Sequence, residues 1–256
     1  MDTTRGCRAV LLVWMMAFVP ASLWADRCDD CHGDPGLYAA DRKLYDYYQD
    51  WLTSPHRRAG VTCSECHGGD PDAEDKATAH AGRLPVIHPS STVYAKRQPE
   101  TCGRCHREVA EQFTGSRHCS KVLSDELAPT CTTCHRAMNR KPYSRDILRQ
   151  SCEHCHNPRH GPGPSEVIDR AAEILHRLSI SRYLLGWTAS HFNREGWPGD
   201  SRRQVEGWRQ AYHAALVRTH SLELLSVEDI SAELLSALKQ AFDEHRGWPP
   251  ARPAGR

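Results

Sequence analysis

The pattern Cys-x-x-Cys-His occurs five times in the chain and uses ten of its twelve cysteines. Each copy supplies two thiols and, directly after the second thiol, an imidazole. This spacing attaches a c-type haem, because the thiols bond to the porphyrin vinyl groups and the histidine becomes the proximal iron ligand. The predicted attachment residues are Cys28, Cys31, Cys63, Cys66, Cys102, Cys105, Cys131, Cys134, Cys152 and Cys155, and the predicted proximal ligands are His32, His67, His106, His135 and His156.

Zinc sites and redox disulfides also use pairs of cysteines with this spacing. Neither explains a histidine after every second cysteine. Tetrahedral zinc sites built from paired units would also leave one of the five units over. We therefore expect five haem c groups per chain as the cofactors.

The N-terminal residues resemble a secretory signal. Arg5 and Arg8 precede an apolar run over residues 9–19, and a small-residue site follows that ends at Ala25. The alternative is a retained membrane anchor, but the apolar run is shorter than the roughly 20 residues that span a bilayer. We expect residues 1–25 to be removed, no membrane span in the mature chain, and a periplasmic or otherwise exported location.

All five motifs fall within residues 26–160, so this segment is too short to bury an ordinary core around each site. We expect the porphyrins to form the core of a haem domain over residues 26–160. A stretch rich in Gly and Pro at 157–164 then interrupts the pattern. The expected fold class is mainly α with much irregular loop, little or no β-sheet, and a C-terminal helical bundle within residues 161–256.

Apolar periodicity predicts three helices in the C-terminal region, over residues 165–186, 201–220 and 226–245. The second opens with a capping-box pattern, Ser201-x-x-Gln204. Its predicted apolar face consists of Val205, Trp208, Tyr212 and Leu216. No catalytic motif is visible in this region, which could pack on the haem domain or form a contact in a homo-oligomer.

The distal iron ligands are less easily assigned. Histidine is abundant, whereas Met138 is the single methionine of the mature chain. Two histidines share a frame with an aromatic residue five positions before and a serine two positions before, as in Trp51-x-x-Ser54-Pro55-His56 and Phe113-x-x-Ser116-Arg117-His118. The candidate distal ligands are His56, His118, His80, His88, His160 and His191.

Other histidines and the last thiol have plainer interpretations. His213 and His220 lie seven residues apart on one predicted helix face, where either could reach a haem, although a structural role is the commoner one. Cys119 is the one thiol of the mature chain outside the motifs, and we interpret it as an inert small residue.

Charge indicates the kind of partner. The chain has 33 basic and 32 acidic side chains and no basic block, so nothing points to nucleic acid. Haem propionates would make the mature protein acidic. We expect redox partner proteins as electron donor and acceptor.

The repeated frame and the stretch Gly-Val-Thr-Cys-Ser-Glu-Cys-His-Gly-Gly at residues 60–69 resemble the multihaem cytochrome c superfamily. This group includes tetrahaem carriers, pentahaem nitrite reductases and octahaem hydroxylamine oxidoreductases. The resemblance covers residues 26–160. It implies closely packed haems, mostly bis-histidine iron, distal histidines on Ser-x-His segments, and a C-terminal helical region that adds a ligand or an oligomer contact.

The chain departs from the enzymes of that group. The nitrite reductases have a lysine in place of histidine in one motif, whereas all five motifs here end in histidine. The hydroxylamine oxidoreductases carry eight haems, whereas this chain has five motifs. We therefore expect an electron carrier with no catalytic residue. The alternatives are an oxidoreductase with one open haem that acts on a small nitrogen or sulfur compound, and a sensory or binding module.

Overall fold

The computed structural model describes residues 27–135, 145–157 and 165–245. All regular secondary structure in these ranges is helical, and they contain no strand. The prediction of a mainly α fold is confirmed. The predicted signal segment, most of the Gly/Pro-rich stretch, Met138 and His160 lie outside the described residues.

Short helices and loops make up residues 27–97. The elements are α1 (Cys28–His32), α2 (Gly36–Ala40), α3 (Arg42–Leu52), α4 (Pro55–Arg58), α5 (Cys63–His67), α6 (Lys76–Ala79) and the 3-10 turn η2 (Ala95–Arg97). Trp51 is the buried residue of α3, and its indole Nε1 donates to the Val61 carbonyl at 3.1 Å. This bond ties α3 to the segment that leads into the second motif.

Residues 98–157 form a second group of helices. They are α7 (Gln98–Gly103), α8 (Arg107–Thr114), α9 (Arg117–Leu123), α10 (Cys131–His135) and α11 (Arg145–Glu153). The apolar side chains of Phe113, Cys119 and Val122 are buried between α8 and α9. Few other apolar side chains are buried in the described part of residues 27–157, as expected for a segment whose interior is completed by porphyrins.

Three long helices form the C-terminal bundle: α12 (Ser165–Arg194), α13 (Ser201–Arg218) and α14 (Glu228–His245), with the 3-10 turns η3 (Thr219–Ser221) and η4 (Leu224–Val227) before α14. One apolar cluster joins all three helices, with Leu185, Val205 and Leu238 among its members. A second cluster around Ile174 and Ala215 closes the other part of the bundle. This tightly packed protein core contrasts with the motif segment.

The predicted helix bounds were close for two of the three helices. The first helix continues to Arg194, beyond the predicted end at residue 186. The predicted capping box is wrong, because α13 begins at Ser201 and its N-cap position is Asp200. Leu216 is 37% exposed, so the predicted apolar face of α13 ends before this residue.

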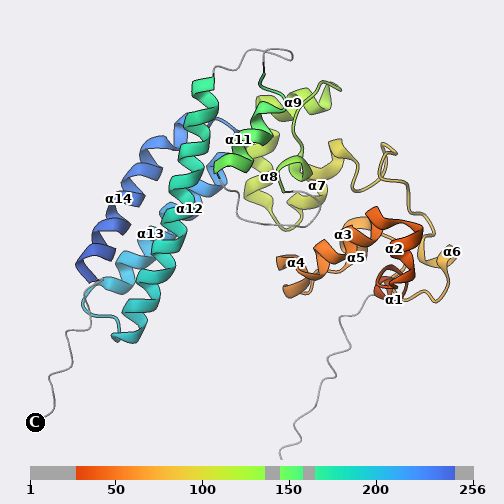
Figure 1. The fold of residues 1–256 in the computed structure, drawn as a ribbon, viewed down its shortest axis with the longest axis horizontal. Helices are drawn as coiled ribbons and strands as arrows, with labels where there is room; N and C mark the ends of the chain where they lie inside the picture. The colour runs from red at the N-terminus through yellow and green to blue at the C-terminus, as the bar shows by residue number, and fades with distance from the viewer. Residues whose placement is uncertain (1–26, 136–144, 158–164, 246–256) are drawn as a thin grey trace, which may run out of the picture.

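The bundle packs against the motif segment through α8 and α11. Helix α8 contacts α13 and η3, and α11 contacts α12. An ion pair of 2.9 Å joins Arg149 of α11 to Asp169 of α12. In Figure 1 the bundle and helices α1–α6 lie at opposite ends of the molecule, with α7–α11 between them. Within the described ranges, no helix combines the length and apolar character that a bilayer crossing requires.

Candidate haem centres

Each of the five motifs folds into one helical turn. Helices α1, α5 and α10 consist of the motif residues themselves. In the third and fifth motifs, the backbone N–H of His106 donates to the Cys102 carbonyl at 2.9 Å, and that of His156 donates to the Cys152 carbonyl at 2.8 Å. Residues three and four apart in a helical turn share one face. The turn therefore presents both thiols and the imidazole to the same side, as attachment of one porphyrin requires.

Four of the five motif histidines face a second histidine from elsewhere in the chain. The ring centroids of His32 and His80 are 6.2 Å apart. The three other pairs each have centroids 6.0 Å apart, and they are His106 with His56, His156 with His118, and His135 with His220. Each pair joins one motif histidine to one histidine outside the motifs.

This separation fits an iron atom between the two rings. Two metal–nitrogen bonds of about 2 Å, with about 1 Å from each ring nitrogen to its ring centre, place the centroids roughly 6 Å apart. Direct stacking of two imidazoles would bring them closer. The paired histidines and the adjacent thiols thus match the donor set of bis-histidine haem c.

The repeated aromatic-x-x-Ser-x-His frame runs from the end of one helix to the start of the next, from α3 to α4 and from α8 to α9. Ser54 is the N-cap of α4 and accepts from the Arg57 backbone N–H at 3.1 Å. Ser116 is the N-cap of α9 and accepts from the Cys119 N–H at the same distance. In both cases the histidine is the second helical residue. The serine cap thus sets the backbone that aims the imidazole.

The aromatic residue of the frame lies in the helix that precedes the capped one. Trp51 and Phe113 are both buried, and each precedes the capping serine by three residues. A similar pattern, Trp187-x-x-Ser190-His191, has a different structure, because it lies inside α12. There Trp187 and His191 stack on each other, with ring centroids 5.1 Å apart.

Hydrogen bonds at the Nδ1 atoms indicate which histidines can bind iron through Nε2. His80 Nδ1 lies 2.7 Å from the Lys76 carbonyl oxygen, and His220 Nδ1 lies 3.0 Å from the Leu216 carbonyl oxygen. A carbonyl only accepts, so both Nδ1 atoms carry the proton. The lone pair is then on Nε2, the arrangement common in metal-binding histidines.

His88 has the opposite arrangement. Its Nδ1 accepts from the Ser90 backbone N–H at 3.1 Å, so the neutral ring carries its proton on Nε2. The side chain is exposed, and the ring contacts of the described residues include none between His88 and a motif histidine. Both histidines precede the third motif, but among the described residues only His80 pairs with a motif histidine.

His191 lies in the C-terminal bundle. It is buried, and besides Trp187 its ring contacts Phe192 and His245. Burial lowers the pKa of His191, and the neighbouring His245 lowers it further. These contacts make it part of the aromatic packing of the bundle.

The second motif differs from the other four. Among the described residues, no histidine ring pairs with His67. Arg83 lies beside it, with Nη2 3.5 Å from His67 Nδ1. Burial lowers the pKa of His67, as do the nearby charges of Arg83 and His32. His32 is the histidine of the first motif, so the first and second motifs lie near each other.

Consecutive motifs are neighbours in space. Burial raises the pKa of the Cys66 thiol, and the Cys102 thiol nearby raises it further. The neighbouring Cys102 and Cys131 thiols shift each other's pKa, which is lowered for Cys102 and raised for Cys131. Burial raises the pKa of the Cys152 thiol, with a further contribution from Cys134. Together with the influence of His32 on His67, these shifts show that each motif lies near the next one in chain order.

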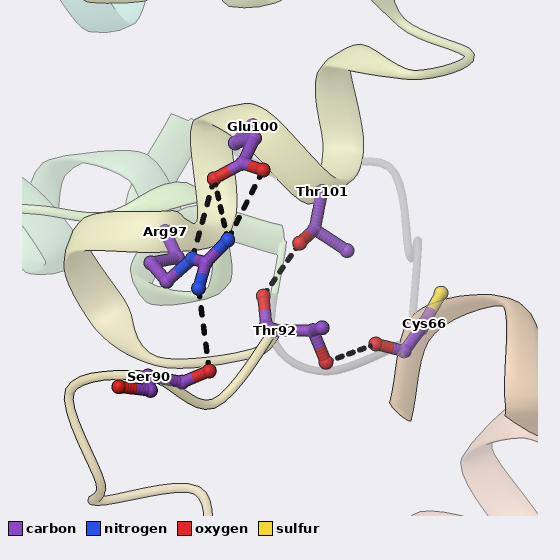
Figure 2. A network of polar contacts seen from close by, with 6 residues as sticks. All are labelled: Cys66, Ser90, Thr92, Arg97, Glu100 and Thr101. Atoms are coloured by element: carbon purple, nitrogen blue, oxygen red, sulfur yellow. Dashed lines mark hydrogen bonds and ion pairs between the residues drawn. The ribbon is translucent and has the colours of Figure 1, made fainter. Parts of the chain in front are cut away.

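Polar bonds hold these junctions. Figure 2 shows Thr92 donating to the Cys66 carbonyl at 2.7 Å while its own carbonyl accepts from Thr101 at 2.5 Å. Thr101 directly precedes Cys102, so the second and third motifs are linked through one residue. At the next junction, the buried Gln98 side chain accepts from both the backbone N–H and the hydroxyl of Thr132.

Comparison with known proteins gives partial matches. The chain is 29% identical over 170 residues to the C-type polyheme cytochrome OmcB from two strains of Geobacter sulfurreducens, which covers 56% of this chain and 21% of the relative. It is 25% identical over 122 residues to cytochrome c nitrite reductase subunit NrfA of Nitratidesulfovibrio vulgaris, which covers 41% of this chain and 21% of that protein.

The match thus spans about a fifth of the length of each curated relative. No family model matches the chain, and no solved structure matches it. The two kinds of relative share the name cytochrome c, and this similarity agrees with the haem-binding donor sets described above.

Proposed function

We propose that this protein is an exported electron-transfer protein that carries five covalently attached haem c groups in a row. The observation that carries the proposal is the set of four histidine pairs, each with one motif histidine and centroids 6.0 to 6.2 Å apart. Haem supplies reversible one-electron oxidation and reduction when bound. The similarity to polyheme and nitrite reductase cytochromes supports the same class.

Three distal ligands follow from the pairs. His80 serves the haem of the first motif, His56 that of the third, and His118 that of the fifth. A second imidazole leaves no coordination position for a substrate and keeps the potential below that of a Met-ligated haem. These sites are therefore suited to electron transfer.

The order of the haems supports a role as a linear conductor. A thiol or imidazole of each motif lies close enough to the next motif in the chain to shift a pKa there. Helix α1, which holds the first motif, lies toward one end of the molecule, and α11, which contains Cys152 of the fifth motif, packs on α12 of the bundle (Figure 1). His135 of the fourth motif faces His220, which follows α13 of the bundle. This arrangement favours one redox partner protein near α1 and another near the opposite end.

The experiment is a haem count followed by voltammetry. Alkaline pyridine absorbance and intact mass of the exported protein should give five haems per chain and loss of residues 1–25. A protein film should show reversible signals and no catalytic current with nitrite, hydroxylamine or sulfite. Four or fewer haems on fully matured protein would refute the proposed count. A catalytic current would show that the protein is an enzyme and would refute the proposed role as an electron carrier.

A second candidate function rests on His67. Its ring has no imidazole partner among the described residues, and the cationic Arg83 lies beside it. A haem with an open distal position there could bind a small nitrogen or sulfur compound, as an oxidoreductase requires. A high-spin ferric signal in the protein as isolated, altered by added cyanide, would favour this candidate. A fully low-spin spectrum would eliminate it.

A further inference from the structure

One histidine of the C-terminal bundle reaches into the motif segment. His220 belongs to η3, the turn that follows α13, and η3 packs against α8 of the motif segment. The His220 ring lies 6.0 Å from that of His135, the last residue of the fourth motif. The two rings are nearly parallel, with 10° between their planes.

The local structure holds the His220 ring in the state that a ligand needs. Its Nδ1 donates to the Leu216 carbonyl at 3.0 Å, which leaves the lone pair on Nε2. The buried Thr219 donates its hydroxyl to the same carbonyl at 2.6 Å. Leu222 then takes a left-handed conformation with φ of 60°, which bulky residues rarely adopt. Packing around η3 therefore maintains this turn.

We propose that Nε2 of His220 is the distal ligand of the iron at the fourth motif, so that an iron–nitrogen bond fastens the C-terminal bundle to the haem region. This inference rests on the proposed function, because it presupposes haem at Cys131 and Cys134. It assigns the bundle of residues 165–245 a part in the redox centre in addition to its packing role.

The neighbouring histidine provides a matched control. His213 lies seven residues earlier on α13, is exposed, and has its Nε2 3.7 Å from a carboxylate oxygen of Glu108 on α8. Like His220, it lies at the boundary between bundle and motif segment, but within the described part of the chain its ring pairs with no motif histidine. His213→Ala tests loss of a boundary contact without loss of a ligand.

The decisive experiment is electron paramagnetic resonance of the full holoprotein with His220→Ala, His220→Met and His213→Ala. Low-spin haem with nearly parallel imidazoles gives a rhombic signal, whereas nearly perpendicular imidazoles give a strongly anisotropic one. His220→Ala should lose the rhombic signal and gain one high-spin haem in five. Added imidazole should restore the low-spin state, and intact mass should still show five haems.

His220→Met should remain low-spin with one potential raised, because a thioether favours the reduced iron. His213→Ala should keep the parent spectrum. The inference is overturned if His220→Ala leaves all signals in place, or if Met138→Leu alone removes the signal of the fourth haem.

The spectra distinguish failure of the His220 assignment from failure of the proposed electron-transfer function. If His56→Ala removes a strongly anisotropic signal while His220→Ala changes nothing, the haem chain stands and only the assignment of His220 fails. If the parent protein shows no bis-histidine signals at all, the proposed function itself fails.

Discussion

His56 faces His106 with ring centroids 6.0 Å apart and 81° between the ring planes. His56 precedes the second motif in the chain, yet its partner belongs to the third. His118 likewise precedes the fourth motif and faces His156 of the fifth. In both cases the paired motif is not the next one in the chain but the one after it, so these histidine pairs connect segments that are separated by a whole motif.

Replacing His56 and replacing His118 should each affect a different haem. His56→Ala and His118→Ala should each convert one low-spin haem to high-spin without changing the haem count, since thioether attachment is independent of the distal ligand. Magnetic circular dichroism and intact mass measure the two properties. His88→Ala is the control and should leave the spectrum unchanged. Parent spectra and potentials in both ligand variants would refute the assignment.

The capping serine should position the ligand of the fifth haem. Ser116→Ala removes the oxygen that accepts from the Cys119 N–H, at a cost of about 1 kcal/mol in stability. We expect a lower thermal midpoint and a partly high-spin fifth haem, and Ser116→Asp should restore both because aspartate is a good N-cap. Loss of stability with an unchanged spin state would show that the cap serves folding alone.

The redox potentials should be predominantly low. The mature chain has one methionine for five irons, so at most one haem can have the high potential that a thioether ligand produces. The others should titrate at mostly negative potentials, as suits a protein that accepts electrons from a low-potential donor. A potentiometric titration in which two or more haems reduce at clearly positive potentials would contradict this expectation.

Cys119 should be unreactive in the folded holoprotein. Its side chain is buried with 3% exposure, and burial raises the pKa of the thiol, so little thiolate forms near neutral pH. Iodoacetamide should therefore leave the native protein unlabelled and add one group after unfolding in denaturant. Rapid labelling of the native protein at neutral pH would show that this region opens readily.

Several features were predictable from residue spacing because the chemistry is local. A Cys-x-x-Cys-His segment holds both thiols and the imidazole within one helical turn, so the predicted attachment sites could be assigned from the sequence alone. The mainly α fold and the three C-terminal helices followed from apolar periodicity. The end of α12 was missed because residues 187–194 pack in the bundle core, where Phe192 is buried.

The distal partners depended on tertiary structure, because each pair joins residues that are distant in the chain. The frame identified His56 and His118 as candidates, but sequence alone did not reveal that each passes over a motif. His191 shares a similar local pattern and is directed by the bundle into an aromatic cluster. His220 was visible only as a residue on a helix face, until the docking of η3 on α8 placed it opposite His135. Spacing determines what a segment can bind, whereas packing between segments determines which imidazoles meet.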